Sequence, residues 1–156
     1  MAADRKTIED ILRAIPHRYP FRFIDEILEL DDEHAVGAYR FREDEYFYQG
    51  HFPGRPITPG VILIETMAQT GIVAMGLYLM MRQNISADQT GHLIPLFTFV
   101  EKVEFEGIVN PGERVVTRGE KIYFRRKNLK AEVNMQTEDG RRICSGVLAG
   151  MLRDNL

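Results

Sequence analysis

The sequence predicts an α+β domain in which one long apolar helix is wrapped by an antiparallel sheet. Residues 61–81 form a nearly uninterrupted apolar stretch, whereas the chain from residue 91 onward shows strand patterns separated by turn signals. A helix that is apolar on nearly every face must be buried in a protein or cross a membrane. Because the later strands can cover it, we expect a single domain over residues 1–156 with this helix at its centre.

The apolar stretch is also long enough to suit a bilayer. Its first half, however, contains Glu65, Thr66, Gln69 and Thr70. An acidic residue inside a membrane helix costs roughly 2.5–3.5 kcal/mol on insertion scales. A lone membrane helix would also leave the strand-rich parts unexplained, so we expect no membrane span.

The composition of the chain argues against several kinds of partner and site. The formal net charge is -3, which gives no general attraction to nucleic acid or anionic membranes. Cys144 is the only cysteine, so no intramolecular disulfide is possible, and its strand-like setting favours a core residue over a reactive thiol. The first six residues contain no apolar signal segment, which favours a cytoplasmic protein. The four histidines lack metal-ligand spacing, so we expect neither metal nor cofactor.

The remaining elements follow from periodicity and turn residues. Apolar residues at 8, 11, 12 and 15 predict a short helix that begins near Thr7 and ends at Pro16. The segment 46–60 combines aromatics, prolines and glycines, which predicts an ordered loop; Thr58 can cap the long helix and Pro59 suits its first position. A connection is expected over residues 82–90. The expected strands are 22–30, 35–41, 93–105, 114–125, 129–136 and 142–152.

Two residues are candidates for acid/base chemistry. His51 lies in a loop stiffened by three prolines, and histidine titrates near neutral pH. Glu65 interrupts the apolar run, where an ionised carboxylate is costly to bury unpaired and burial favours the protonated form that a general acid needs. The alternatives are a structural loop histidine and a buried glutamate paired with an arginine or with Gln69 one turn later.

The start of the long helix offers a third element. Amides of a first helical turn have no helical partner and carry partial positive charge, and Gly60 has no side chain to block them. A thioester carbonyl held there would be polarised, although a simple helix start would look the same. Together the three parts fit a base that removes a proton alpha to a thioester, amides that hold the enolate, and an acid that protonates the leaving β-hydroxyl. The spacing leaves open whether His51 and Glu65 meet within one chain or across a dimer.

The run GHFPGRPITPGV at residues 50–61, followed by ETMAQ at 65–69, resembles the FabZ-type 3-hydroxyacyl-[acyl-carrier-protein] dehydratases. The run IPHRYPF at residues 15–21 is similar to the N-terminal motif of that family. The resemblance implies a hot-dog fold, which is a long central helix wrapped by an antiparallel sheet. It also implies dehydration of 3-hydroxyacyl thioesters on acyl carrier protein to trans-2-enoyl thioesters in fatty acid biosynthesis, without a cofactor.

The same resemblance implies a homodimer with two active sites at the interface, often assembled as a trimer of dimers. Each site would use the motif histidine, His51, and a glutamate from the other subunit at the position of Glu65. The family's substrate contacts would fall on Gly60, Val61, Gln69 and Phe52. The related FabA-type dehydratase/isomerases have Asp at the acid position, so Glu65 favours simple dehydration.

The sequence also departs from the family pattern. Tyr39-Arg40 replaces a usual Lys-Asn pair and Glu101 a usual Asp. Glu104 and Glu106 stand where basic residues usually help to meet the acidic carrier protein. A compensating patch could come from Lys121, Arg125, Arg126 and Lys127, and the acyl-tunnel gate falls near Leu96. These departures indicate a specialised branch. A thioesterase or isomerising dehydratase of the same fold and a non-catalytic carrier-binding subunit are the alternatives.

Overall fold

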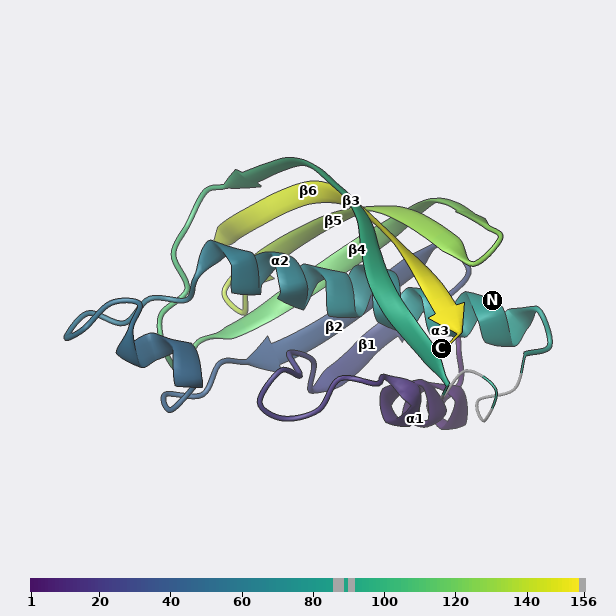
Figure 1. The fold of residues 1–156 in the computed structure, drawn as a ribbon, viewed down its shortest axis with the longest axis horizontal. Coiled ribbons are helices and arrows are strands. Elements are labelled where there is room, and N and C mark those ends of the chain that lie inside the picture. The colour runs from purple at the N-terminus through teal and green to yellow at the C-terminus, as the bar shows by residue number, and fades with distance from the viewer. Residues whose placement is uncertain (86–88, 90–91, 155–156) are drawn as a thin grey trace.

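A long helix lies inside a curved six-stranded antiparallel sheet in the computed structural model, which describes residues 1–85, 89 and 92–154 (Figure 1). The helix runs continuously through α2 (Gly60–Ala68), the π-helical segment η2 (Gln69–Ala74) and α3 (Met75–Arg82). Every residue from 66 to 80 is buried. The helix is apolar all round because protein covers it on all sides.

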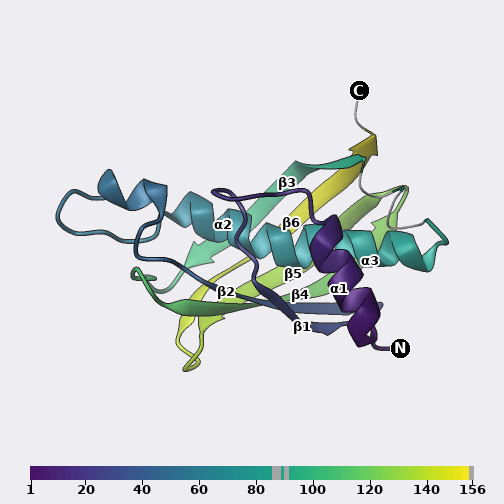
Figure 2. The same ribbon diagram turned by 90° about the horizontal axis from the view of Figure 1, so that it is seen from below.

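The sheet has the strand order β1-β2-β4-β5-β6-β3, with all neighbours antiparallel. The strands are β1 (Glu26–Leu30), β2 (His34–Arg40), β3 (Leu93–Phe105), β4 (Arg114–Arg125), β5 (Asn128–Thr137) and β6 (Arg142–Asp154). Buried and accessible positions alternate along β5, as expected for a strand with one face on the core. Helix α1 (Arg5–Ala14) packs against β1 and α3 (Figure 2).

The predicted architecture is confirmed, and β3 and β4 have the predicted bounds. The basic stretch after β4 is a two-residue turn in which Arg126 and Lys127 have φ of 52° and 61°, as a tight hairpin turn requires. The predicted first strand was too long, because β1 begins at Glu26, and the Asp25 amide, which donates to the Ala38 carbonyl at 2.8 Å, extends its contact with β2. Part of the predicted 82–90 connection lies outside the described residues.

Both predicted helix starts were slightly wrong, since α1 begins two residues before Thr7 and the long helix one residue after Pro59. Helix α1 begins at Arg5 because the carboxylate of Asp4 accepts a hydrogen bond from the Thr7 amide and caps it. The long helix begins at Gly60 with Pro59 at the N-cap and no side-chain cap. Thr58 does not cap it because its hydroxyl is bonded to that of Tyr48, at 2.7 Å.

Among the described residues, one helix, Gly60–Arg82, has the length and apolarity of a membrane span. Its most apolar stretch of 18 residues has a mean hydropathy of 1.5, and 78% of that stretch is buried inside the fold. Burial under the sheet therefore accounts for its apolar character.

Strand β3 forms one edge of the sheet and, among the described residues, pairs only with β6. It is 13 residues long, and its accessible side chains include large apolar ones between 42% and 50% exposed. These are Ile94, Leu96, Phe97, Phe99, Val100 and Phe105. A long apolar edge strand is a surface that proteins normally cover, because its free N–H and C=O groups can pair with another chain.

The backbones of the helix and the sheet come close together at two glycines, Gly71 and Gly119. A Cβ atom added to Gly119 on β4 would lie 2.8 Å from the Cα of Gly71 in η2. A Cβ atom added to Gly71 would lie 2.7 Å from Cγ2 of Val133 on β5. At Gly76, one and a half helical turns later, the nearest atom would be 3.4 Å away, which is ordinary contact.

This difference predicts opposite effects of the same substitution on stability. Gly71→Ala should destabilise the protein by about 1–3 kcal/mol through overpacking. The matched variant Gly76→Ala should be neutral or stabilise by about 0.5–1 kcal/mol, because alanine is the better helix former. Urea denaturation followed by circular dichroism measures both values. Equal effects of the two substitutions would contradict the close approach at Gly71.

Candidate active site

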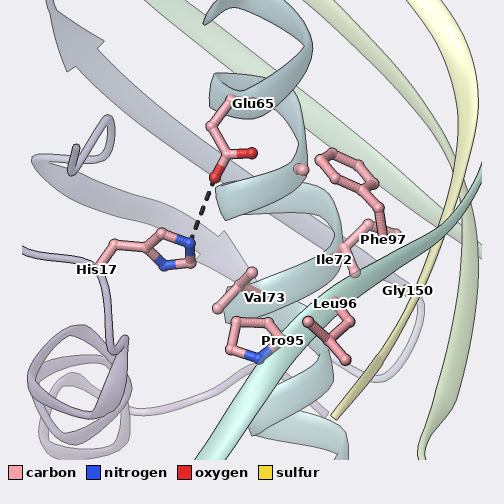
Figure 3. Close-up of a pocket in the computed structure, with 9 residues that line it drawn as sticks. His17, Glu65, Ile72, Val73, Pro95, Leu96, Phe97 and Gly150 are labelled. Atoms are coloured by element: carbon pink, nitrogen blue, oxygen red, sulfur yellow. Dashed lines mark ion pairs between the residues drawn. The ribbon is translucent and has the colours of Figure 1, made fainter. Parts of the chain in front are cut away.

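Glu65 lines a pocket between the long helix and strand β3. Its side chain is 15% exposed, and the empty volume beside it is about 280 Å³, part of it open to solvent. The lining residues are His17, Glu65, Ala68, Ile72, Val73, Pro95, Leu96, Phe97 and Gly150. Figure 3 shows the carboxylate at one end of this mainly apolar group. An ionisable group among apolar walls needs polar partners, which identifies this pocket as a candidate site.

The side chain of Gln69 supplies one of these partners. Its Nε2 donates to Oε1 of Glu65 at 2.9 Å and to the carbonyl of Phe21 at 3.0 Å. Its Oε1 accepts from the amide of Phe23 at 2.6 Å. The amide orientation is fixed by these partners, because a backbone carbonyl can only accept and a backbone N–H can only donate. Gln69 therefore ties the N-terminal loop to the carboxylate; its predicted contact with substrate stays a prediction.

His17 is the second polar group beside the carboxylate. Its Nε2 lies 3.3 Å from Oε1 of Glu65 (Figure 3), and its side chain is 17% exposed. The sequence marked His17 only as part of the IPHRYPF motif and gave no role for it. A contact with a residue 48 positions away leaves no local pattern in the sequence. The only available signal for His17 was therefore its position between two prolines.

His51 lies in the loop that follows the short helix η1 (Tyr46–Gln49). The loop closes on itself, since the Ile57 amide donates to the His51 carbonyl at 2.9 Å. Nδ1 of His51 lies 2.9 Å from the carbonyl oxygen of Ile57. A carbonyl can only accept, so Nδ1 carries the proton and Nε2 of the neutral ring keeps a free lone pair. This is the tautomer that a general base requires.

Buried polar contacts hold the His51 loop in place. The hydroxyls of Tyr48 and Thr58 share a hydrogen bond across the loop, and burial raises the pKa of Tyr48 to about 12. The buried carboxylate of Glu45 accepts hydrogen bonds from the Tyr39 hydroxyl and from Arg42, the latter at 2.8 Å. Burial also raises the pKa of Tyr39, so its hydroxyl stays a donor. Tyr39 is one of the two residues on β2 that differ from the usual family pattern, and it thus helps to support the loop.

The start of the long helix keeps its first amides free of acceptors. In the described part of the chain, no hydrogen bond is donated by the amide of Gly60 or Val61. The ring of Phe105 covers Gly60 so closely that an added Cβ would lie 3.0 Å from its Cζ. Val61 is 74% exposed. Two unpaired amides at a helix N-terminus are suited to bind an oxygen that gains negative charge.

The structure does not bring His51 and Glu65 together within one chain. His51 is not among the residues that line the Glu65 pocket, and within the described residues no hydrogen bond or ion pair joins the two side chains. Phe52 stacks on His51 with ring centres 4.1 Å apart and is 51% exposed. The predicted residues thus fall into two groups, Glu65 with Gln69 and His51 with Phe52, without a hydrogen bond between them in the described residues.

Cys144 is buried on β6, with its Sγ 3.6 Å from Sδ of Met67. Burial raises the pKa of its thiol to about 12. Because the thiolate is the nucleophile, this thiol is unreactive at neutral pH. The expectation of a core cysteine is confirmed.

A long helix inside an antiparallel sheet, with a carboxylate in an apolar pocket beside it, defines a protein of the hot-dog fold. The structure is similar to the dehydratase heterocomplex ApeI:P from Xenorhabdus doucetiae, with a TM-score of 0.76, 16% identity and coverage of 92% of this chain and 91% of that chain. A hypothetical thioesterase from Streptococcus pneumoniae, solved with coenzyme A, aligns with a TM-score of 0.56 and 14% identity over 98% of both chains. These similarities confirm the predicted fold.

Sequence comparison gives the family. The model of the FabA-like domain matches residues 15–147. The chain is 37% identical over 142 residues to the 3-hydroxyacyl-[acyl-carrier-protein] dehydratase FabZ of Caldicellulosiruptor bescii, which covers 90% of this chain and 94% of the relative. It is 38% identical to the FabZ of Roseiflexus castenholzii, over 90% and 92% of the two chains. The chain therefore belongs to the FabA-like family, and the predicted FabZ-type resemblance is confirmed.

The environment of Cys144 predicts its chemical inertness. With a pKa of about 12, about one thiol in ten thousand is ionised at pH 8. A disulfide reagent such as 5,5′-dithiobis(2-nitrobenzoate) should therefore not react with the native protein at this pH, and should detect one thiol per chain in urea. Cys144→Ser serves as the blank. Rapid labelling of the folded protein would contradict the assignment.

Proposed function

We propose that this protein removes water from 3-hydroxyacyl thioesters carried on acyl carrier protein and forms trans-2-enoyl thioesters. Family membership supports this class of reaction, since the matched relatives are 3-hydroxyacyl-[acyl-carrier-protein] dehydratases. The observation that carries the proposal is the Glu65 carboxylate, which is held by polar partners through one oxygen inside an apolar pocket.

His51 acts as the general base in this mechanism. Its Nδ1–H donates to the Ile57 carbonyl, which leaves Nε2 to take the proton alpha to the thioester carbonyl. The imidazolium that forms keeps the Nδ1–H bond to this carbonyl, and a carbonyl dipole stabilises positive charge on the ring. The closed loop also fixes the direction of Nε2, so the ring does not have to reorient during proton transfer.

The helix start stabilises the charge that builds up on the thioester. Removal of the alpha proton moves charge to the carbonyl oxygen as an enolate, which the free amides of Gly60 and Val61 are suited to bind. Donors of this kind are typically worth about 3–4 kcal/mol in the transition state. Phe105 lies over Gly60, where it excludes water from one side of the amides.

Glu65 acts as the general acid. Both of its polar contacts fall on Oε1, and Figure 3 shows the second carboxylate oxygen directed away from His17. That oxygen, when protonated, can give its proton to the departing β-hydroxyl and release it as water. The apolar walls of Ile72, Val73 and Leu96 suit the acyl chain.

The two groups of residues complete one site across a homodimer. Pro95, Leu96 and Phe97 of β3 line the Glu65 pocket, and the same strand is the exposed apolar edge of the sheet. A second copy that pairs along this edge would cover the apolar side chains and stand beside the pocket. His51 of one subunit would then face Glu65 of the other. A trimer of dimers, as the resemblance implies, is the larger assembly we propose.

The surface that meets the carrier protein includes the turn between β4 and β5. Lys121 and Lys127 of the predicted patch already face acids, Glu33 at 3.0 Å and Asp154 at 3.8 Å. Arg125 and Arg126 are exposed, which leaves them as the proposed contacts for an acidic partner. We place this chemistry in the cytoplasm.

Product analysis separates this reaction from the alternatives that share the fold. A thioesterase would release free acid and thiol, and an isomerising dehydratase would shift the double bond. A carrier-binding subunit would bind without turnover. Glu65 and the tautomer of His51 favour dehydration over binding without turnover, because a pure binding module needs neither.

Removal of either proposed catalytic group should abolish turnover without unfolding the protein. His51→Ala and Glu65→Gln should each lower kcat for hydration of a crotonyl thioester by about 10²–10⁴-fold, the usual contribution of general acid–base catalysis. Loss of enoyl absorbance measures the rate. His34→Ala, which changes a surface histidine 31% exposed on β2, serves as the control and should retain activity. Wild-type rates in His51→Ala or Glu65→Gln would exclude this mechanism.

Mixing the two inactive variants tests the shared site. A dimer with one His51→Ala chain and one Glu65→Gln chain has one intact His51–Glu65 pair if the sites cross the interface. Random reassociation after mild denaturation should therefore restore about a quarter of wild-type activity, because half of the dimers are mixed and each has one working site. Absence of any recovery, despite mixed dimers on native mass spectrometry, would show that each site lies within one chain.

A further inference from the structure

We propose that His17 is a positioning residue that fixes Oε1 of Glu65 and so makes Oε2 the oxygen that transfers the proton. The inference rests on the proposed function, because it assigns the way in which the general acid is aimed. His17 itself does not touch the reacting atoms in this scheme. It acts through the carboxylate, from a part of the chain that lies before the sheet.

Two side-chain nitrogens from different elements lie close to one carboxylate oxygen. Nε2 of Gln69 reaches Oε1 from the same helix at 2.9 Å, and Nε2 of His17 reaches it from the N-terminal loop at 3.3 Å. A glutamate side chain has three rotatable bonds, so a single contact from its own helix leaves other orientations open. A second contact, from a separate element, restricts the carboxylate to one orientation. Oε2 has no hydrogen bond within the described part of the chain.

The protonation of His17 follows from its surroundings. Its Nδ1 is buried and, among the described residues, has no hydrogen-bond partner. A proton on Nδ1 would therefore be a buried unpaired donor, which costs more than a bare lone pair at the same place. The neutral ring with its proton on Nε2 avoids this cost, and Nε2 is the ring nitrogen that lies 3.3 Å from Oε1 of Glu65.

The loop that carries His17 is itself held firmly. Arg18 donates to the carbonyl of Ile15 and, at 2.9 Å, to that of His17. Arg22 donates to the carbonyl of Leu12 at 2.8 Å, which ties the far end of the loop to α1. The ring of Phe21 stacks against His17 at 6.4 Å. A histidine on such a support can impose an orientation on the carboxylate instead of following it.

A pair of substitutions separates positioning from simple packing. His17→Phe keeps a flat ring of similar size but removes the donor, whereas His17→Gln places an amide N–H near the position of Nε2. We expect His17→Phe to lower kcat by about 10–100-fold with KM changed less than about threefold, since small misplacement of a catalytic group acts on the chemical step. His17→Gln should recover most of kcat. Thermal melts of both variants verify folding, and His34→Phe is the matched control.

Nitrogen-15 NMR of the histidine rings gives a readout that does not depend on turnover. His17, assigned by its loss in His17→Gln, should be neutral with its proton on Nε2, and that resonance should shift in Glu65→Ala. A proton on Nδ1, wild-type kcat in folded His17→Phe, or no recovery in folded His17→Gln would each overturn the inference. A wild-type protein without dehydratase activity that still shows this NMR pattern would refute the proposed reaction and support the His17–Glu65 contact.

Discussion

The need to keep the helix Gly60–Arg82 out of water determines the rest of the structure. No face of this helix can be left exposed, because residues 66–80 have no polar side to present to solvent apart from a few side chains with specific partners. The sheet curves around it, and α1 and the N-terminal loop cover what the sheet leaves open (Figure 2). The glycine contacts at η2 show how close this packing is, with backbone nearly touching backbone between Gly71 and Gly119.

The polar side chains on the buried part of the helix are therefore few. Gln69 satisfies two backbone groups of the N-terminal loop and still contacts Glu65, so one fully buried amide links the loop, the helix and the candidate acid. Thr66 returns its hydroxyl to the carbonyl of Ile62 in its own helix, at 2.7 Å. Oε2 of Glu65 has no hydrogen bond within the described residues. A carboxylate oxygen left free beside an apolar pocket is available for chemistry.

Much of this arrangement followed from the sequence because it depends on local signals. Strands β3 and β4 were placed correctly by their turn residues and alternation, and Glu65 was conspicuous in an apolar run. Helix α1 begins two residues before the predicted Thr7, because Asp4 caps it. The long helix begins one residue after the predicted Pro59, because the Thr58 hydroxyl is bonded to that of Tyr48. His17 was missed as a partner of Glu65 for the same kind of reason, since only the folded chain brings residue 17 to residue 65.

The order of the strands along the chain has a consequence for synthesis of the protein. Strand β3 emerges from the ribosome before β4, β5 and β6, yet among the described residues its partner is β6, which ends at Asp154. The aromatic strand 93–105 must therefore remain unpaired until β6 has been synthesised. Its pairing is also among the most distant in sequence, which slows folding. The nascent chain thus exposes this apolar strand until its partner has been made, and this strand is where a chaperone would be expected to bind.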